Sequence, residues 1–419
     1  MNRFLALALC LIFSFTMYAI DDIPKAEDLI GNSWVDDGVG LPESLNENLD
    51  SLLHEWHIKT YRPLSSECEC DSMNPYFTDE VIKNRLNSIY TVIPMTYNDI
   101  VRKFIDMYSG NRRKQMEVML GLSSYYFPLF ETTLERHGLP LELKYLAIVE
   151  SALNPVAVSK AGATGLWQFM FGTGRIYGLN INTLIDERRD PIKSSEAAAK
   201  YLKDLFGIYG DWHLAIAAYN CGPGNLNKAI RRSGGKRNYW EIYNYLPRET
   251  RGYVPLFIAA NYVMQHHKEH GICPVEMTLS TLTDTIMLNQ KVHFDQIAAV
   301  IGISKGELMS MNPQYRMEII PGSPETPLSV CLPSNYTLSF IDNMDSIPKY
   351  KATELLLANA TSEPSVIKPA VNDYKVYKVR KGDTLSTIAN RHRVTVTKLK
   401  KWNSMHTTRI FPGQRLKIF

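Results

Sequence analysis

The stretch that decides the fold reads Leu141-Glu142-Leu143-Lys144-Tyr145-Leu146-Ala147-Ile148-Val149-Glu150-Ser151. Its apolar residues have helical spacing, and Leu143, Leu146 and Glu150 fall on one stripe. Glu150 therefore stands where a leucine is expected. Burial on that stripe and a place in the last helical turn both disfavour the charged carboxylate, so we expect a raised pKa for Glu150. A carboxylic acid that stays protonated near neutral pH can act as a general acid.

The residues after Glu150 predict a structured loop that could wall a groove. Pro155 cannot continue the helix, while Gly162 and Gly165 permit close backbone approach because they lack Cβ. Aromatic rings can stack on sugar faces, and a primary amide can pair with hydroxyls and acetamides. The side chains of these two kinds are Trp167, Phe169 and Gln168.

Two more clusters follow along the chain. An apolar helix is predicted from Trp212, and it ends in Tyr219-Asn220 before the turn Gly222-Pro223-Gly224. Further on, Tyr253 stands at the start of an apolar run. Several spaced motifs that occur together are a far more specific signal than any one of them.

In this order, the motifs resemble the signature of the soluble-lysozyme-like lytic transglycosylases: Glu-Ser, Gly-Leu-x-Gln, Ala-Tyr-Asn-x-Gly and a late Tyr-Val. The resemblance covers residues 90–265 and implies a mainly α, lysozyme-like catalytic domain. Helical periodicity from Ile100 to Tyr108 and from Arg113 to His137 agrees with that fold class. One departure is Phe171, where the family pattern usually has proline, and this leaves the local loop conformation open.

Carried over position by position, the resemblance makes Glu150 the catalytic acid/base. It also implies contacts with the glycan for Ser151, Gly165, Gln168, Tyr219, Asn220 and Tyr253. The ring of Phe169 is a further predicted substrate contact.

Ordinary glycosidases use two carboxylates, and the motifs contain only one. Asp190 before Pro191 predicts a helix N-cap, and Asp186 and Glu187 lie in a polar connection, so we assign all three a structural role. The resemblance implies a single-acid reaction without metal or other cofactor. In that reaction, Glu150 protonates the oxygen between MurNAc and GlcNAc and then deprotonates the substrate's own C6 hydroxyl, which closes a 1,6-anhydro ring.

The chain has 419 residues, of which 45% are hydrophobic and 21% charged, and this predicts two or more globular domains. The first 20 residues predict a secretory signal, with Arg3 before an apolar stretch and a cut near Ala19. Met17 is larger than the residue usual three positions before the cut, so membrane association through an uncleaved segment is the alternative. Export across the inner membrane predicts a periplasmic or cell-envelope location.

Cysteine spacing predicts no zinc site. Beyond Cys10, the odd set comprises Cys68, Cys70, Cys221, Cys273 and Cys331. Their pairing stays open.

The C-terminal third contains an internal repeat with a period of 91 residues. Ile297, Leu308, Asn312 and Pro321-Gly322 recur as Ile388, Leu399, Asn403 and Pro412-Gly413. The second copy predicts a strand, two helices and a strand, which resembles LysM, a small α+β module (βααβ) that binds N-acetylated glycans. The first copy resembles LysM too but lacks the Gly-Asp-Thr turn, so we expect a degenerate repeat with a structural role.

The LysM resemblance implies glycan contacts from two loops of the second copy. These are Gly382, Asp383, Thr384 and Leu385 in the first loop, and Ile410, Phe411 and Pro412 in the second. From residue 374 to 419, twelve Lys or Arg accompany one acid, a net charge of +11. A module this basic raises a nucleic-acid alternative, but export leaves cell-wall carboxylates as the polyanion, so peptidoglycan strands are the expected partner.

Six segments are therefore expected. They are a signal peptide (1–20), a lead-in (21–90), the catalytic domain (91–268), the degenerate repeat (280–335), a linker (345–373) and the LysM module (374–419). A linker of this kind would raise the local concentration of the enzyme on its polymer.

Two alternatives to the transglycosylase remain. One is a peptidoglycan-binding scaffold in which the lysozyme-like domain no longer turns over. The other is a muramidase that hydrolyses the same bond, which differs only in whether water reaches the intermediate.

Overall fold

The computed structural model describes residues 74–361 except 278, and residues 375–418 except 381, 393, 404, 406, 409 and 412. The predicted signal segment, most of the predicted lead-in and residues 362–374 lie outside this part of the chain. The chain divides into two compact units, Met1–Tyr350 and Lys351–Phe419.

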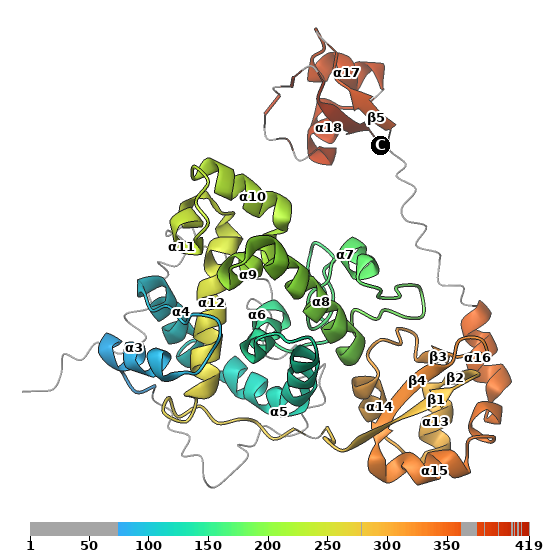
Figure 1. Cartoon of the computed structure of the whole chain (residues 1–419). Coiled ribbons are helices and arrows are strands. Elements are labelled where there is room, and N and C mark those ends of the chain that lie inside the picture. Colours follow the sequence, from blue (N-terminus) through green and yellow to red (C-terminus); the bar gives the residue numbers. More distant parts are fainter. Residues whose placement is uncertain are drawn as a thin grey trace, which may run out of the picture. The chain divides into compact units, whose positions relative to one another are not determined.

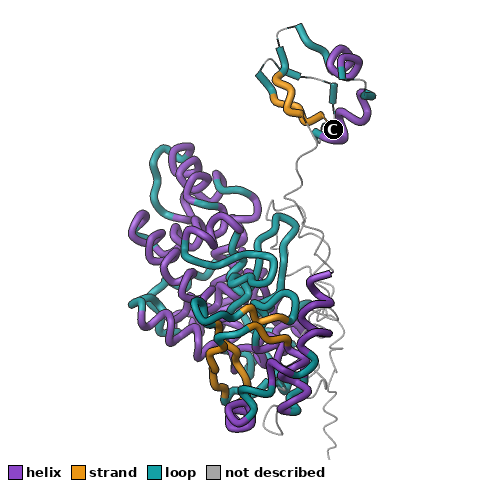
Figure 2. Tube along the Cα trace, turned by 90° about the vertical axis from the view of Figure 1, so that its right-hand side faces the viewer, coloured by secondary structure: helices purple, strands orange, loops and turns teal. Residues whose placement is uncertain are grey.

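Helices make up the first part of unit 1, where the sequence predicted a mainly α domain (Figures 1 and 2). They are α3 (Asp79–Ser88), α4 (Asp99–Ser109), α5 (Arg113–Arg136), α6 (Leu146–Ser151), α7 (Phe171–Ile176), α8 (Pro191–Tyr209), α9 (Trp212–Cys221), α10 (Pro223–Arg232), α11 (Tyr239–Ile242) and α12 (Arg248–Gln265), with 3-10 turns η3 (Leu141–Tyr145) and η4 (Tyr243–Tyr245). The predicted fold class is confirmed.

Local signals fix several of these boundaries. Asn98 caps α4 by accepting from the backbone N–H of Ile100 and Val101. Asp190 caps α8 in the same way, with Pro191 at the first helical position as predicted, so its carboxylate is engaged in the fold. Gly210, at φ +66°, ends α8 in the left-handed conformation that favours glycine.

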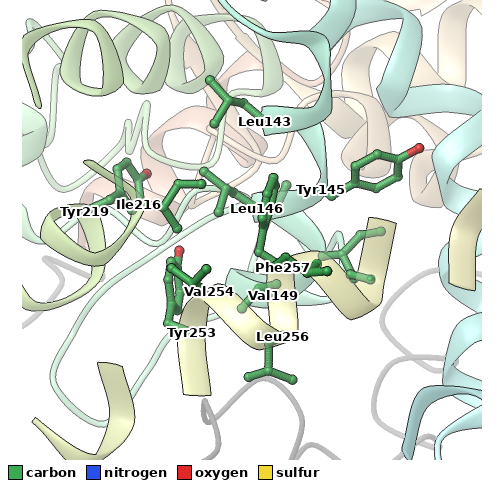
Figure 3. Close-up of a cluster of buried hydrophobic side chains, with 14 of the residues drawn as sticks. Leu143, Tyr145, Leu146, Val149, Ile216, Tyr219, Tyr253, Val254, Leu256 and Phe257 are labelled. Carbon is green, nitrogen blue, oxygen red and sulfur yellow. The ribbon is translucent and has the colours of Figure 1, made fainter. Parts of the chain in front are cut away.

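Helix α12 is the centre of the helical core of unit 1, and it packs against α4, α6 and α9 (Figure 1). Figure 3 shows side chains of α6, α9 and α12 meeting there, among them Leu146, Ile216 and Phe257. The same core includes Ile82 and Leu86 of α3. The predicted domain start at residue 91 was therefore too late. The sequence did not reveal α3 as part of the domain, because its short apolar stripe is surrounded by polar residues.

The decisive stretch forms two helical segments rather than one. Leu141–Tyr145 is a 3-10 turn, and α6 covers only Leu146–Ser151. Leu143 and Leu146 are fully buried as predicted, whereas Glu150 keeps part of its surface exposed. Glu150 does lie in the last turn, because Ala152 ends the helix with φ +51°.

A LysM-like repeat completes unit 1. Its elements are β1 (Thr283–Leu288), β2 (Lys291–His293), α13 (Phe294–Ile301), α14 (Lys305–Met311), β3 (Ile319–Pro321), β4 (Leu328–Pro333), η5 (Ser334–Tyr336), α15 (Thr337–Asp342) and η6 (Ile347–Lys349). Antiparallel pairs join β1 to β4 and β2 to β3. Phe340 and Ile347 are buried in the core of this repeat, so its predicted end at 335 was too early.

Unit 2 contains α16 (Ala352–Thr361) and the predicted strand, two helices and strand: β5 (Lys375–Lys378), α17 (Leu385–Arg391), α18 (Val396–Trp402) and β6 (Arg415–Ile418). Strand β5 pairs antiparallel with β6. Helices α17 and α18 each begin 91 residues after α13 and α14, which matches the repeat found in the sequence. The predicted linker was wrong at its start, because η6 and α16 occupy residues 347–349 and 352–361.

No helix in the described part of the chain combines the length and the hydropathy that a membrane crossing needs.

Candidate active site

Glu150 and Tyr253 form the centre of the candidate site. The Tyr253 hydroxyl, on α12, donates a hydrogen bond to Oε1 of Glu150, on α6. Burial raises the pKa of Glu150 to about 8, and the charge of Glu249 adds to the rise, while the hydrogen bond from Tyr253 opposes it. Burial also holds the pKa of Tyr253 well above its usual value, so this hydroxyl stays a donor. At neutral pH Glu150 is therefore mostly a carboxylic acid, as the sequence predicted.

Glu249 is a residue that sequence reasoning missed. It lies in the first turn of α12, four residues before Tyr253, and its exposed carboxylate acts on Glu150 through its charge. Residues four apart share a helix face, so this spacing was the available signal once Tyr253 had been assigned to the site.

The loop that follows α6 is held by hydroxyl groups from two helices. The Ser151 hydroxyl donates to the backbone oxygen of Leu166 (2.9 Å) and lies 3.0 Å from that of Ala147. The Tyr219 hydroxyl, on α9, donates to the oxygen of Trp167 (2.7 Å). Ser151 is fully buried. The structure thus gives Ser151 and Tyr219 an anchoring role beside the substrate contacts predicted for them.

Gln168 is held in a strained conformation in this loop. Its φ is +46°, and Ala152 and Leu153 near Glu150 also have positive φ. Such conformations collect at functional sites, where the surrounding structure holds them in place. The Gln168 amide nitrogen donates to the oxygens of Gly165 (2.9 Å) and Ala157 (3.2 Å). Its two donors are therefore used within the loop, and its oxygen is the atom left to accept from a ligand.

Gly165 is required by close backbone packing. Its φ is +88°, and a Cβ built there would lie 1.8 Å from the backbone oxygen of Arg188. Any side chain at this position would displace residues 188–189. The structure therefore explains Gly165 by this contact, and a role in binding sugar remains a prediction.

Both aromatic rings proposed for sugar stacking lie inside the core. Trp167 is fully buried, and its indole nitrogen donates to the Ser195 hydroxyl (2.9 Å). Phe169 is buried against Tyr201 and Tyr219. Stacking on a sugar face needs an exposed ring face, so in this conformation these rings support the loop instead.

Asn220 is oriented by a neighbouring helix. Its side-chain oxygen accepts from the Thr250 hydroxyl (2.7 Å) at the start of α12. The amide nitrogen of half-buried Asn220 is left as the donor for a ligand.

The departure at Phe171 lies at the start of a helix. Phe171 is the first residue of α7, the helical position that best tolerates proline. Its side chain is 51% exposed. A proline or a phenylalanine can begin this helix.

In unit 2, the predicted glycan-binding residues differ in exposure. Gly382 has φ +93°, which its turn requires, and Asp383 accepts from the Arg380 backbone N–H (2.9 Å) and the Tyr377 hydroxyl (2.7 Å). Thr384 caps α17, and Leu385 is buried in the core of the module. Ile410 is half-buried and Phe411 is 59% exposed, while Pro412 lies outside the described residues. Exposed Gly382, Thr384 and Phe411 are the positions that a ligand can reach directly.

One group of side chains in the described residues has metal-ligand geometry, namely His293, Asp295 and Glu318. Lys305 forms ion pairs with both carboxylates, at 3.0 Å and 2.6 Å. The His293 ring accepts from the backbone N–H of Asp295 and so caps α13. Lys305 already pairs with the carboxylates of Asp295 and Glu318. We therefore interpret the group as a helix cap beside an ion pair, and not as a metal site.

Comparisons with known proteins match three ranges of the chain. The model described as "Transglycosylase SLT domain" matches residues 128–242, and "LysM domain" matches residues 377–419. Residues 282–349 match "Lytic transglycosylase MltD, LysM-like domain". The chain is 32% identical over 325 residues to "Membrane-bound lytic murein transglycosylase D" of Escherichia coli strain K12, across 77% of this chain and 69% of that relative.

The chain belongs to the family of membrane-bound lytic murein transglycosylase D. The resemblance inferred from the Glu150, Gln168 and Tyr219 motifs is thereby confirmed. The chain is also similar to the soluble lytic murein transglycosylase of Escherichia coli strain K12, at 31% identity over 27% of this chain and 19% of that one. A solved 70 kDa soluble lytic transglycosylase of Escherichia coli matches at 21% identity with a TM-score of 0.31, over 46% of this chain and 30% of the other.

Proposed function

We propose that this member of the transglycosylase D family cleaves the β-1,4 bond between MurNAc and GlcNAc in peptidoglycan and leaves a 1,6-anhydro-MurNAc end. Glu150 is the single general acid/base. The observation that carries the proposal is the contact at the end of α6, where the Tyr253 hydroxyl donates to the Glu150 carboxyl group and burial raises the pKa of that group to about 8. General acids need a pKa near the working pH.

The reaction balances with one carboxyl group. Glu150 donates its proton to the glycosidic oxygen as the bond from that oxygen to MurNAc C1 breaks. The resulting carboxylate removes the proton from the MurNAc C6 hydroxyl, whose oxygen bonds to C1. Glu150 is then protonated again, and no water is consumed. Tyr253 steadies the carboxylate between the two steps, because its hydroxyl can donate to the charged form.

The LysM module of unit 2 is proposed to bind the glycan and to hold the enzyme on the wall. Its exposed Gly382, Thr384 and Phe411 offer the contacts, and its basic charge favours cell-wall carboxylates. We also place the protein in the cell envelope, outside the inner membrane. The disulfide at Cys273 supports that location, because disulfides persist in oxidising compartments.

The test is mass spectrometry of the soluble products from purified peptidoglycan, with Glu150→Gln as the inactive control. Products ending in 1,6-anhydro-MurNAc, absent from the control, support the proposal. Reducing ends that borohydride converts to alditols would identify a muramidase instead. A protein that binds the wall and releases no product would be a scaffold.

Exposed Glu249 allows a sharper separation of the two chemistries. A hydrolase with two carboxylates would need a second acid, and Glu249 is the one whose charge reaches Glu150. The single-acid reaction predicts that Glu249→Gln keeps its anhydro products. Glu241→Gln, at an exposed glutamate paired with Lys236 (3.2 Å), is the matched control.

A further inference from the structure

A short segment of the catalytic part, residues 184–189, touches the LysM-like repeat; we call it the strap. An antiparallel bridge joins Ile185 to Tyr315. The backbone N–H of Asp186 donates to the Gln314 oxygen (2.9 Å), and the N–H of Arg316 donates to the Leu184 oxygen (2.9 Å). These bonds connect two parts of the chain that are more than a hundred residues apart.

Apolar packing strengthens the same junction. Ile185 is only 5% exposed, and it belongs to the hydrophobic core of the LysM-like repeat together with Phe294 and Tyr315. Leu184 packs against this core from the side. The repeat thus contains a residue of the catalytic part inside its own core.

The other end of the strap holds the loop of the candidate site. The guanidinium of Arg188 is paired with Asp186, with N–O distances of 2.9 Å and 2.8 Å. Its remaining nitrogen donates to the backbone oxygens of Gly162 (3.0 Å) and Phe169 (3.2 Å). These two oxygens flank Gly165 and Gln168. Arg188 and Asp186 are both buried, so water cannot replace these bonds.

The backbone of the strap also sets the position of the loop. The Arg188 oxygen lies against Gly165 so closely that no Cβ fits between them. A shift of the strap would therefore shift the loop, because close-packed interiors transmit displacement.

We infer that the LysM-like repeat acts as a brace for the active site, and that Ile185 and Arg188 are positioning residues through which it fixes the Gln168 loop. The repeat on this account serves turnover directly, beyond the structural role expected from its lost Gly-Asp-Thr turn. The inference rests on the proposed site at Glu150. The route from the repeat to that site runs through Tyr315, Ile185 and Arg188 to the oxygens of Gly162 and Phe169.

The first experiment compares Ile185→Ala with Ile301→Ala in the full-length protein. Both isoleucines belong to the core of the repeat and are 5% and 8% exposed, but Ile301 lies at the end of α13, outside the strap. Both changes delete the same atoms from the same core. Kinetics on soluble glycan strands give kcat and KM, and amide hydrogen exchange reports on the loop at residues 162–169.

We expect Ile185→Ala to lower kcat about ten-fold and to speed exchange at the Gln168 and Phe169 amides, since small displacements of positioned groups are costly in rate. Ile301→Ala should lower the melting temperature of the repeat and leave kcat within about two-fold. Equal effects of the two variants on kcat and on exchange would overturn the brace. Hydrogen exchange does not require turnover, so it tests the brace even in an inactive protein. An inactive wild-type protein would therefore reject the proposed function, and the exchange rates of the two variants would still decide whether the brace exists.

The second experiment removes the clamp, by which we mean the Asp186–Arg188 ion pair and its hydrogen bonds to the loop. It does so without leaving a buried charge. The double variant Asp186→Leu with Arg188→Met replaces both ions by apolar groups of similar size, a change that folded proteins often tolerate. It should reproduce the loss in kcat and the faster loop exchange, with a melting temperature close to that of the wild type. Wild-type kcat in this variant would overturn the role of Arg188.

Discussion

The hydroxyl of Tyr253 on α12 donates to the carboxyl group of Glu150 on α6, and the two residues are 103 positions apart in the chain. Only the packing of these two helices in one core brings them together. The contact ties the protonation of Glu150 to a second helix, and several measurable consequences follow from it.

The first concerns the pH profile of the enzyme. Because the pKa of Glu150 is raised to about 8 and the proposed first step needs its protonated form, kcat/KM should be flat below that pH and fall above it. The loss should be about ten-fold per pH unit beyond the pKa. Rates on soluble glycan strands between pH 5 and 10 test this. A fall in rate on lowering the pH from 7 to 5 would contradict the assignment.

Changes at Tyr253 and Glu249 should move this profile in opposite directions. The hydrogen bond from Tyr253 lowers the pKa of Glu150, so Tyr253→Phe should shift the alkaline limb to higher pH and lower kcat about ten-fold. The charge of Glu249 raises that pKa, so Glu249→Gln should shift the limb to lower pH. Shifts of the same sign in both variants would be inconsistent with the geometry described.

Stability should depend on the same carboxyl group. The folded pKa of Glu150 lies above its ordinary value, so the folded state binds an extra proton between pH 4.5 and about 8, and stability falls as pH rises through that window. Glu150→Gln removes this dependence. We expect the variant to gain about 1–3 kcal/mol over the wild type at pH 9, a figure reduced for partial exposure, and almost nothing at pH 4.

Urea unfolding at pH 4, 7 and 9 measures this difference. Glu241→Gln, at an exposed position, is the control and should show no such trend. A gain of equal size at pH 4 would mean that the substitution acts through packing and not through charge.

Ser151 should matter through its hydroxyl. Ser151→Ala leaves the Leu166 oxygen without this partner, so we expect a loss of about 1–2 kcal/mol in the free energy of unfolding and about ten-fold in kcat. Ser123→Ala is matched, since that hydroxyl donates to Leu120 within its own helix (2.7 Å). An unchanged kcat in Ser151→Ala would show that α6 does not need this anchor.

Removal of unit 2 should separate binding from turnover. A chain ending at Tyr350 retains the complete catalytic part and the LysM-like repeat. We expect it to cleave short soluble glycans at the wild-type rate but to lose at least about ten-fold in activity on intact sacculi, because the proposed glycan-binding module is gone. Sedimentation with sacculi and assays on both substrates test this prediction.

The local features of this fold could be predicted from the sequence. The caps at Asp190 and the periodicity of α4 and α5 depend on neighbours within a few residues, and they were predicted correctly. The boundary at Ile347 was missed because that residue joins a core formed by strands far earlier in the chain.

In the candidate site, too, local features could be predicted from the sequence, whereas features that depend on distant contacts could not. The raised pKa of Glu150 could be predicted because a carboxylate on an apolar stripe is visible in the sequence. The burial of Phe169 and Leu385, and the clamp between Arg188 and the loop, depend on which helices pack together, and no spacing in the sequence reveals that.

The loop beside Glu150 is fastened by its backbone oxygens: Ser151 holds Leu166, Tyr219 holds Trp167 and Arg188 holds Phe169. Every amino acid has a backbone oxygen, so this fastening does not depend on which side chains the loop carries. The exposed loop positions, such as Val158 and Lys160, could therefore be varied to alter glycan preference while the loop backbone keeps its conformation. Ser151, Tyr219 and Arg188, which hold the loop backbone, should be left unchanged in a library of such variants.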